Sequence, residues 1–347
     1  MKIIINGRFL TQNITGVQRV GLEITKELDK IAKPGEIEIV SPPEIINKIN
    51  LKNIKMVVVG KKSSNGWVQV DLPRYAKKQH GVILTMSGLP SVLMPDYFIA
   101  HDTTFYRFPQ TFTKKFIVSY LVCFKLSLSR CRKIFTVSNF SKNELIKVFK
   151  VKADSFCIIS PSSQHLRDME YKSISVSKWE LKNDDYYLSV SSKAKHKNQK
   201  YIEECANRYP DRKFVIVGGN SSNFSAYKAN QLKNLIYTGY VSDDELYSLY
   251  KHAKGFIFPS LYEGFGIPPL EAITLGIKHI AVSDISVLRE IYDRGVYFFD
   301  PTNAADFDVE KLDRSEISDE DLQHYREKYS WEKSAKIIYQ EIMKNEK

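Results

Sequence analysis

Short apolar runs alternate along the chain with polar, glycine-containing loops and with segments whose apolar residues recur at helical spacing. Runs of this length, bounded by Gly, Asn and Pro, predict buried β-strands. The expected strands are residues 3–5, 37–40, 56–59, 81–86, 97–99, 134–137, 186–190, 213–219, 235–241, 255–258 and 279–282. Helical spacing marks residues 22–28, 113–133, 270–275 and the chain from about 318 onward. Strand, helix, strand in this order predicts an α/β protein with parallel strands.

The segment between residues 161 and 185 is polar, mixed in charge and poor in periodicity, which indicates an interdomain linker. A chain of 347 residues is long enough for two domains of ordinary size. We therefore expect a first domain at residues 1–165, a linker at 166–185, a second domain at 186–318 and C-terminal helices at 319–347.

Positive charge is concentrated in the first half of the chain. Residues 1–160 hold 25 Lys and Arg against 11 Asp and Glu, a balance of +14, whereas residues 161–347 hold 26 against 29, a balance of −3. This asymmetry indicates an anionic partner for the first half, such as a membrane surface, a lipid-linked phosphate or a nucleic acid. Zinc-finger spacing, an aromatic stacking signature and an Arg-rich arm are all missing from the sequence, so a nucleic acid is not expected.

The helix expected at residues 113–133 is the most strongly basic element of that half. Its apolar residues share one face, and its lysines and arginines lie elsewhere. Two interpretations remain open. Such a helix can lie on an anionic membrane, or it can be a core helix with a solvated basic face.

The composition gives no indication of a metal site or a membrane span. The 43% hydrophobic and 26% charged residues are ordinary for a soluble globular protein. Cys123, Cys131, Cys157 and Cys205 show no metal-binding spacing, which favours a reduced, cytoplasmic protein. The longest apolar run, at 116–124, is shorter than the roughly 20 residues that a spanning helix needs. The pair Asp306 and Asp308 lies in a late acidic loop, and we do not expect it to bind metal.

The loop at residues 259–271 carries the clearest chemistry, because it joins an apolar strand to a helix that opens with two prolines. Gly264 and Gly266 let the backbone approach a ligand closely. The helix N-terminus offers N–H donors to an anion. The donors expected here are the backbone amides of Phe265, Gly266 and Ile267. Glu263 and Glu271 flank this phosphate seat and are expected to accept hydrogen bonds from neutral hydroxyls, such as those of a sugar and a ribose.

The string Pro-Ser-Leu-Tyr-Glu-Gly-Phe-Gly-Ile-Pro-Pro-Leu-Glu-Ala, with seven residues between its two glutamates, resembles the donor-site signature of retaining glycosyltransferases of family 4. The resemblance implies the GT-B fold, in which two Rossmann-like domains place their parallel sheets on either side of a cleft. It implies that Glu263 contacts hydroxyls of the transferred sugar and that Glu271 holds the ribose. It also implies that the helices at 319–347 cross back to the first domain.

Further residues take roles from the same resemblance. Gly16, in the loop after the first strand, would face the donor, and His101 would lie against the donor sugar. The backbone of Gly239 and Val241 would hold the nucleotide base. A plain turn at Gly16 and a structural role for His101 are the alternatives, and Asp102 would either orient His101 or cap the next turn.

The loop after the strand at 186–190 departs from the family pattern. Family members usually have Gly and often Arg near the positions of Ser191 and Ser192, and this chain lacks both. Lys197 is retained and is the expected phosphate contact, and Lys193 is a possible substitute for the arginine. A solvated basic loop is the alternative.

The resemblance predicts a metal-independent, retaining glycosyltransferase without a cofactor. It would move a sugar from a nucleotide-diphosphate donor to a hydroxyl of a lipid-linked saccharide acceptor in cell-surface polysaccharide synthesis. We expect a cytoplasmic protein with peripheral contact to an anionic membrane. The alternatives are a non-catalytic GT-B subunit, suggested by the altered loop at Ser191 and Ser192, and a sugar-nucleotide epimerase, which would not need the basic half.

Overall fold

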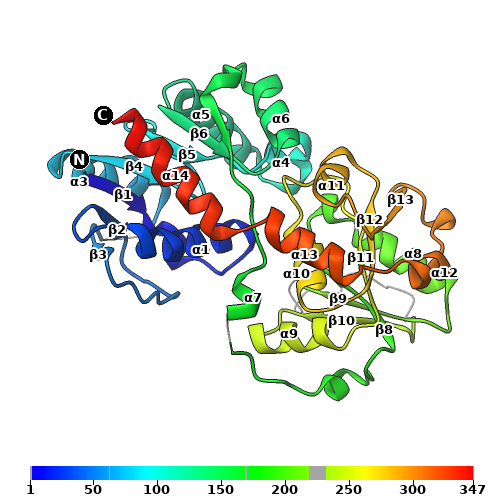
Figure 1. Ribbon diagram of the computed structural model, residues 1–347. Helices are drawn as coiled ribbons and strands as arrows, with labels where there is room; N and C mark the ends of the chain where they lie inside the picture. Colours follow the sequence, from blue (N-terminus) through cyan, green and yellow to red (C-terminus); the bar gives the residue numbers. More distant parts are fainter. Residues whose placement is uncertain (1, 62, 169, 219–231, 347) are drawn as a thin grey trace. The chain divides into compact units, whose positions relative to one another are not determined.

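The computed structural model describes residues 2–61, 63–168, 170–218 and 232–346 (Figure 1). Residue 169 of the expected linker and Gly219, at the end of an expected strand, lie outside the described residues. The chain divides into two compact units. Unit 1 comprises Met1–Pro161 and Tyr329–Lys347, and unit 2 comprises Ser162–Lys328.

The described residues of unit 1 form a seven-stranded sheet in the order β3-β2-β1-β4-β5-β6-β7, and all its pairings are parallel. Its strands are β1 (Lys2–Asn6), β2 (Ile37–Ser41), β3 (Lys55–Val58), β4 (Gly81–Thr85), β5 (Tyr97–Ile99), β6 (Lys133–Thr136) and β7 (Phe156–Ile158). β2 and β4 are buried along their whole length. Burial on both faces explains why both strands are mostly apolar. Glu38, the buried carboxylate of β2, is paired with Lys2 at 2.8 Å.

The helices that connect these parallel strands are α1 (Gly16–Ile31), α2 (Asn65–Gln69), α3 (Asp71–Lys78), α4 (Thr104–Arg107), α5 (Lys114–Leu128) and α6 (Asn139–Phe149). The last helix of the chain, α14 (Trp331–Asn345), also belongs to unit 1. The helix expected at 113–133 is α5. It begins where the Thr113 hydroxyl accepts a hydrogen bond from the amide of Phe116, and it ends at Leu128, because residues from Lys133 onward pair with β5 as β6.

The C-terminal helix α14 belongs to unit 1, where it contacts α1 (Figure 1). The Ser334 hydroxyl accepts a hydrogen bond from the amide of Ser160 at 3.0 Å and donates one to the Ser160 carbonyl at 2.8 Å. At the other end, Tyr97 donates to Glu346 at 2.8 Å. Side chains and backbone thus attach the last helix to strands and loops far away in sequence.

Unit 2 has its own parallel sheet, in which the described strands follow the order β10-β9-β8-β11-β12-β13. The strands are β8 (Tyr186–Val190), β9 (Lys213–Val217), β10 (Leu235–Gly239), β11 (Gly255–Phe258), β12 (His279–Ser283) and β13 (Tyr297–Phe299). The helices are α7 (His165–Asp168), α8 (Gln199–Arg208), α9 (Asp243–Lys251), α10 (Ile267–Thr274), α11 (Ser286–Ile291), α12 (Val309–Arg314) and α13 (Asp319–Lys328). Buried aromatic residues such as Tyr187, Tyr201 and Phe214 fill its core.

The segment that the sequence analysis assigned to a linker, residues 166–185, clusters with unit 2. The amide of Lys172 donates to Asp244 at 3.0 Å, and that of Ile174 donates to the Ser248 hydroxyl at 2.8 Å. Both acceptors lie on α9. These contacts use backbone amides and polar side chains, so they produce no apolar periodicity in the sequence. The sequence pattern therefore does not reveal that the segment packs against α9.

None of the helices within the described residues has both the length and the apolar character needed to cross a membrane.

Replacing Ser334 by Ala should destabilise unit 1. The substitution leaves an N–H and a C=O of Ser160 without their partner, which costs about 1–3 kcal/mol. Urea unfolding of the full chain should show this loss in the transition of unit 1. Lys336→Ala on the exposed face of the same helix serves as the control, and an equal loss in that variant would contradict a specific role for Ser334.

Candidate functional site

The strand order of unit 2 reverses direction between β8 and β11, which lie side by side. From β8 the chain continues through α8 to β9 on one side, and from β11 it continues through α10 to β12 on the other. The loops after the two strands therefore diverge at the carboxyl edge of the sheet. In parallel α/β sheets, this topological switch point is where ligands bind.

Hydrogen bonds join the two loops that leave this point. The side-chain amide of Asn198 donates to the carbonyl of Pro259 at 3.1 Å and to that of Pro301 at 2.8 Å. The amide of Leu261 donates to the carbonyl of His196 at 2.7 Å. The 3₁₀ turn Lys195–Lys197 after β8 is thereby held against the loop after β11.

Lys197 and Glu263 form an ion pair across these loops, with 2.6 Å between Nζ and Oε1. Glu263 is buried, and a buried carboxylate needs a cation or several donors to remain charged. Lys197 supplies that cation. Because an ammonium group has three donors, Lys197 can bind a second anion while it neutralises Glu263. The structure thus brings together the two residues predicted to contact the phosphate and the sugar.

Gly266 sets the course of the loop into α10. Its φ of 92° lies in the left-handed region, and a Cβ there would lie 2.9 Å from Cδ2 of Leu288 and 3.3 Å from Cε1 of Phe258. The hydroxyl of buried Tyr292 donates to the carbonyl of Gly266. Glycine is therefore required at this position by both backbone conformation and space.

The first turn of α10 offers fewer donors than an ordinary helix. Pro268 and Pro269 follow Ile267 at the second and third helical positions, and proline has no N–H group. The predicted anion seat therefore consists of the amides of Phe265, Gly266 and Ile267, which precede the prolines. The side chain of Phe265 is buried. Lys197 adds a cation to these neutral donors.

Glu271, one turn into α10, is held by two residues that the sequence analysis did not indicate. Tyr250 on α9 donates to Oε2 of Glu271 at 3.0 Å, and burial raises the pKa of Tyr250 well above its usual range, so the hydroxyl stays a donor. Nε2 of His165 on α7 lies 3.6 Å from Oε1. The Ser163 hydroxyl, 2.6 Å from that of Thr274, joins the segment before α7 to the end of α10.

Little in the sequence indicated that Tyr250 and His165 belong to the site. Tyr250 has the spacing of a core aromatic residue, and His165 lies next to the expected linker.

The remaining predicted donor-site residues of unit 2 lie in loops at the same edge of the sheet. Gly239 ends β10 with a φ of 71°, and its carbonyl accepts a hydrogen bond from the amide of Gly218 at 2.9 Å. Val241 is buried two residues later. Lys193 is exposed in the loop after β8.

The loop that departs from the family pattern is held by a side chain. The Gln199 side-chain amide donates to the carbonyls of Ser191 at 3.2 Å and Ser192 at 3.3 Å. These bonds fix the loop although the glycine and arginine usual in the family are replaced.

His101 and Gly16 belong to unit 1. Nε2 of His101 donates to the carbonyl of Met86 at 2.8 Å, since a carbonyl can only accept. Burial lowers the pKa of His101, which favours the neutral imidazole at pH 7. Asp102 caps the next turn by accepting a hydrogen bond from the amide of Thr104 at 2.7 Å. Gly16 is the exposed first residue of α1.

Arg8 is a further candidate that the sequence analysis did not single out. It follows β1 at the point where the sheet order of unit 1 reverses, between β1 and β4. Burial lowers the pKa of its guanidinium group.

Within the part of the chain that the structure describes, no group of three or more His, Cys, Asp or Glu side chains is arranged to hold a metal ion. Asp306 and Asp308 have structural partners. Asp306 accepts a hydrogen bond from Asn303 at 2.6 Å, and Asp308 caps α12 by accepting from the amides of Glu310 and Lys311.

Known proteins share this sequence pattern and fold. Residues 172–331 match the family model described as "Glycosyl transferases group 1". The chain is 30% identical over 207 residues to the O-antigen chain mannosyltransferase RfbU of Salmonella typhimurium, a match covering 58% of this chain and 55% of that protein. It is 26% identical over 344 residues to the O-antigen chain mannosyltransferase B of Escherichia coli, covering 87% of each.

Among solved structures, Anabaena HepE in complex with UDP-glucose superposes with a TM-score of 0.71 at 14% identity, covering 99% of this chain and 100% of that one. The match to RfbU spans little more than half of that protein's length. Together with the two parallel sheets, these similarities identify the fold as GT-B, and the similarity to group 1 glycosyltransferases covers residues 172–331, from unit 2 to the start of α14.

Proposed function

We propose that the chain is a retaining glycosyltransferase that moves a sugar from a nucleotide-diphosphate donor to a hydroxyl of a saccharide acceptor. The observation that carries the proposal is the ion pair between half-buried Lys197 and buried Glu263 at the switch point of unit 2. It places a carboxylate for sugar hydroxyls next to a cation for a diphosphate. The mannosyltransferase relatives support mannose as the transferred sugar.

Each site residue has a role in this proposal. Glu263 accepts hydrogen bonds from hydroxyls of the transferred sugar, and Glu271, held by Tyr250, accepts them from the ribose. Lys197 and the amides of Phe265, Gly266 and Ile267 bind the diphosphate. When the bond between the sugar and the phosphate breaks, these donors stabilise the charge that develops on the phosphate.

The acceptor hydroxyl attacks from the face that the diphosphate leaves, so the anomeric configuration is retained. A new bond forms between the sugar carbon and the acceptor oxygen, the bond to the phosphate oxygen breaks, and the hydroxyl proton passes to the departing phosphate. No metal ion takes part. His101, Gly16, Lys193, Gly239 and Val241 keep the donor-side roles that the family resemblance gives them.

The acceptor in this proposal is a lipid-linked saccharide in cell-surface polysaccharide synthesis, and the reaction takes place in the cytoplasm at the membrane surface. The names of the two O-antigen relatives support this setting.

Replacing Glu263 by Gln should lower the rate of transfer by roughly 10²–10³-fold, because the sugar loses a charged acceptor in the transition state. The fold should be unchanged, since Gln has the same shape. Kinetics with a nucleotide-sugar donor measure the effect. Glu310→Gln, at an exposed site paired with Arg212, is the control. Turnover at the wild-type rate in Glu263→Gln would overturn the assignment.

Replacing Tyr250 by Phe should weaken nucleotide binding about tenfold, because Glu271 loses the hydrogen bond that orients its carboxylate. A thermal-shift panel of UDP, GDP, ADP and dTDP, alone and with mannose or glucose attached, first identifies the nucleotide, since a ligand of the folded state raises Tm.

Tyr209→Phe removes a comparable hydrogen bond, to the carbonyl of Phe307, and should leave the affinity unchanged. If no nucleotide stabilises the wild type, the non-catalytic subunit suggested by the Ser191–Ser192 loop becomes the better proposal.

Transfer should continue in EDTA at its full rate, because Lys197 and the loop amides supply the positive charge that a metal ion would otherwise provide. Initial rates with EDTA, and with Mg²⁺ added back, test this. A rate that collapses in EDTA and recovers with Mg²⁺ would contradict the metal-independent mechanism.

A further inference from the structure

Helix α5 of unit 1 is fixed to the protein by a ladder of aromatic side chains. Phe112, Phe116, Tyr120 and Phe124 lie four residues apart and stack in sequence, with ring centroids 4.9, 4.1 and 5.7 Å apart. Phe98, on β5, meets Phe124 edge to face at 5.2 Å. Packing of one face in this way leaves the opposite face of the helix pointing outward.

The outward face carries aliphatic side chains in a row with a cation at each end. Lys114, Val118, Val122, Leu126 and Arg130 follow one another at a spacing of four residues. Val118 is 62% exposed, Val122 52% and Leu126 39%. A row of exposed aliphatic side chains between cations is a surface to which a partner can bind.

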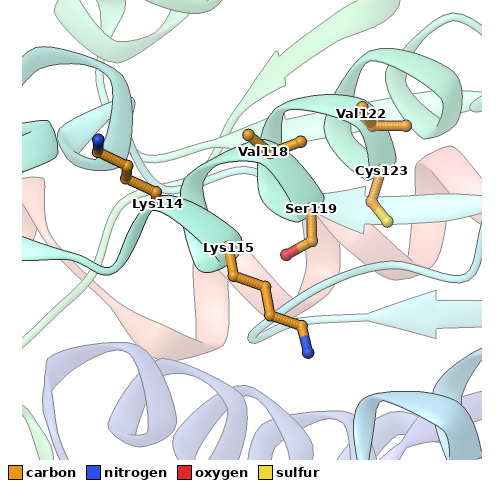
Figure 2. Close-up of a pocket in the computed structure, with 6 residues that line it drawn as sticks. All are labelled: Lys114, Lys115, Val118, Ser119, Val122 and Cys123. Atoms are coloured by element: carbon orange, nitrogen blue, oxygen red, sulfur yellow. The ribbon is translucent and has the colours of Figure 1, made fainter.

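Figure 2 shows the first part of this row, Lys114, Val118 and Val122, beside a second row formed by Lys115, Ser119 and Cys123. The six residues line an open pocket of about 550 Å³. Beyond the end of the helix, Arg130 donates to the carbonyl of Val92 at 3.5 Å, next to the exposed side chain of Leu93. The apolar surface thus continues past the helix.

The surrounding charge is of one sign. Residues 103–143 contain eight Lys and Arg and no Asp or Glu. Three of these cations are paired with carboxylates: Arg107 with Glu144, Arg132 with Asp96, and Lys133 with Glu341. The four on or beside the outward face, Lys114, Lys115, Lys125 and Arg130, form no ion pair with any described residue.

We infer that the outward face of α5 binds the surface of an anionic lipid bilayer. Lys114, Lys115, Lys125 and Arg130 would contact headgroup phosphates, while Val118, Val122 and Leu126 enter the boundary of the acyl chains. The three aliphatic residues extend over roughly 12 Å of helix. This length is too short to span a bilayer, which needs about 30 Å, but it is enough for a contact at the bilayer surface.

The chemistry of the face distinguishes a bilayer from other partners. Protein interfaces are enriched in aromatic residues and depleted in lysine, whereas the aromatic residues of α5 face inward. A nucleic acid would contact the cations but would leave the aliphatic row in water. A bilayer offers phosphates to the cations and acyl chains to the aliphatic row. The inference does not depend on the roles proposed for Lys197, Glu263 and Glu271 in donor binding, because these residues belong to unit 2.

Co-sedimentation of the full chain with lipid vesicles tests the inference. The protein should bind vesicles of phosphatidylcholine and phosphatidylglycerol, and binding should fall in pure phosphatidylcholine and at high salt, where screening shortens the range of the attraction. The double variant Val118→Glu, Val122→Glu should bind at least about tenfold more weakly. In the double variant Lys114→Gln, Lys115→Gln, the affinity for anionic vesicles should fall roughly fivefold for each lysine removed.

Matched variants in the same unit serve as controls. Val58 and Val70 are 55% and 47% exposed, so Val58→Glu, Val70→Glu makes the same chemical change at similar exposure away from α5. Lys77→Gln, Lys78→Gln removes the same charge from α3. Both should bind vesicles as the wild type does, and all variants should keep the wild-type Tm and nucleotide thermal shift.

Three results would overturn the inference. The first is a wild type that does not bind the anionic vesicles. The second is equal binding by the α5 variants and their controls. The third is a wild-type oligomer that dissociates in Val118→Glu, Val122→Glu, measured by light scattering, because a second copy of the chain would then cover the face.

Discussion

The ion pair between Lys197 and Glu263 is the contact on which the organisation of the candidate site depends. Burial of a carboxylate such as Glu263 costs free energy unless a cation pairs with it, and Lys197, in the loop after the neighbouring strand, is that cation. Asn198, which follows Lys197, holds the two loops together through the carbonyls of Pro259 and Pro301. The same turn therefore supplies both the cation and the framework that keeps it in place.

The start of α10 shows how charge and geometry are divided between residues. Two prolines remove N–H groups from its first turn and so reduce what the helix terminus alone can offer an anion. Lys197 adds a full positive charge beside this terminus. Gly266 lets the backbone pass close to Leu288 and Phe258, where a Cβ would not fit. Glu271 is oriented from a different direction, by Tyr250 of α9 and His165 of α7. Lys197 with Glu263 and Tyr250 with Glu271 thus form two separate sets of contacts around the start of α10.

Unit 1 has a different electrostatic character. Cations near its C-terminal helix are neutralised, as in the pairs of Arg132 with Asp96 and of Lys133 with Glu341, whereas those along the outward face of α5 are not. Along this face, cations without an ion pair among the described residues occur together with the exposed side chains of Val118, Val122 and Leu126.

The sequence by itself determined the parallel strands and the loop at residues 259–271, because continuous apolar runs and glycine–proline turns are local signals. It placed β1, β8 and β11 within one or two residues of their observed ends. It missed the three-residue strands β7 and β13, although it found β5, which has the same length. Only the tertiary structure decided which side chains meet. Lys197 and Glu263 are 66 residues apart, and Tyr250 reaches Glu271 from another helix. Such pairings follow from the order of strands in the sheet, which local sequence does not specify.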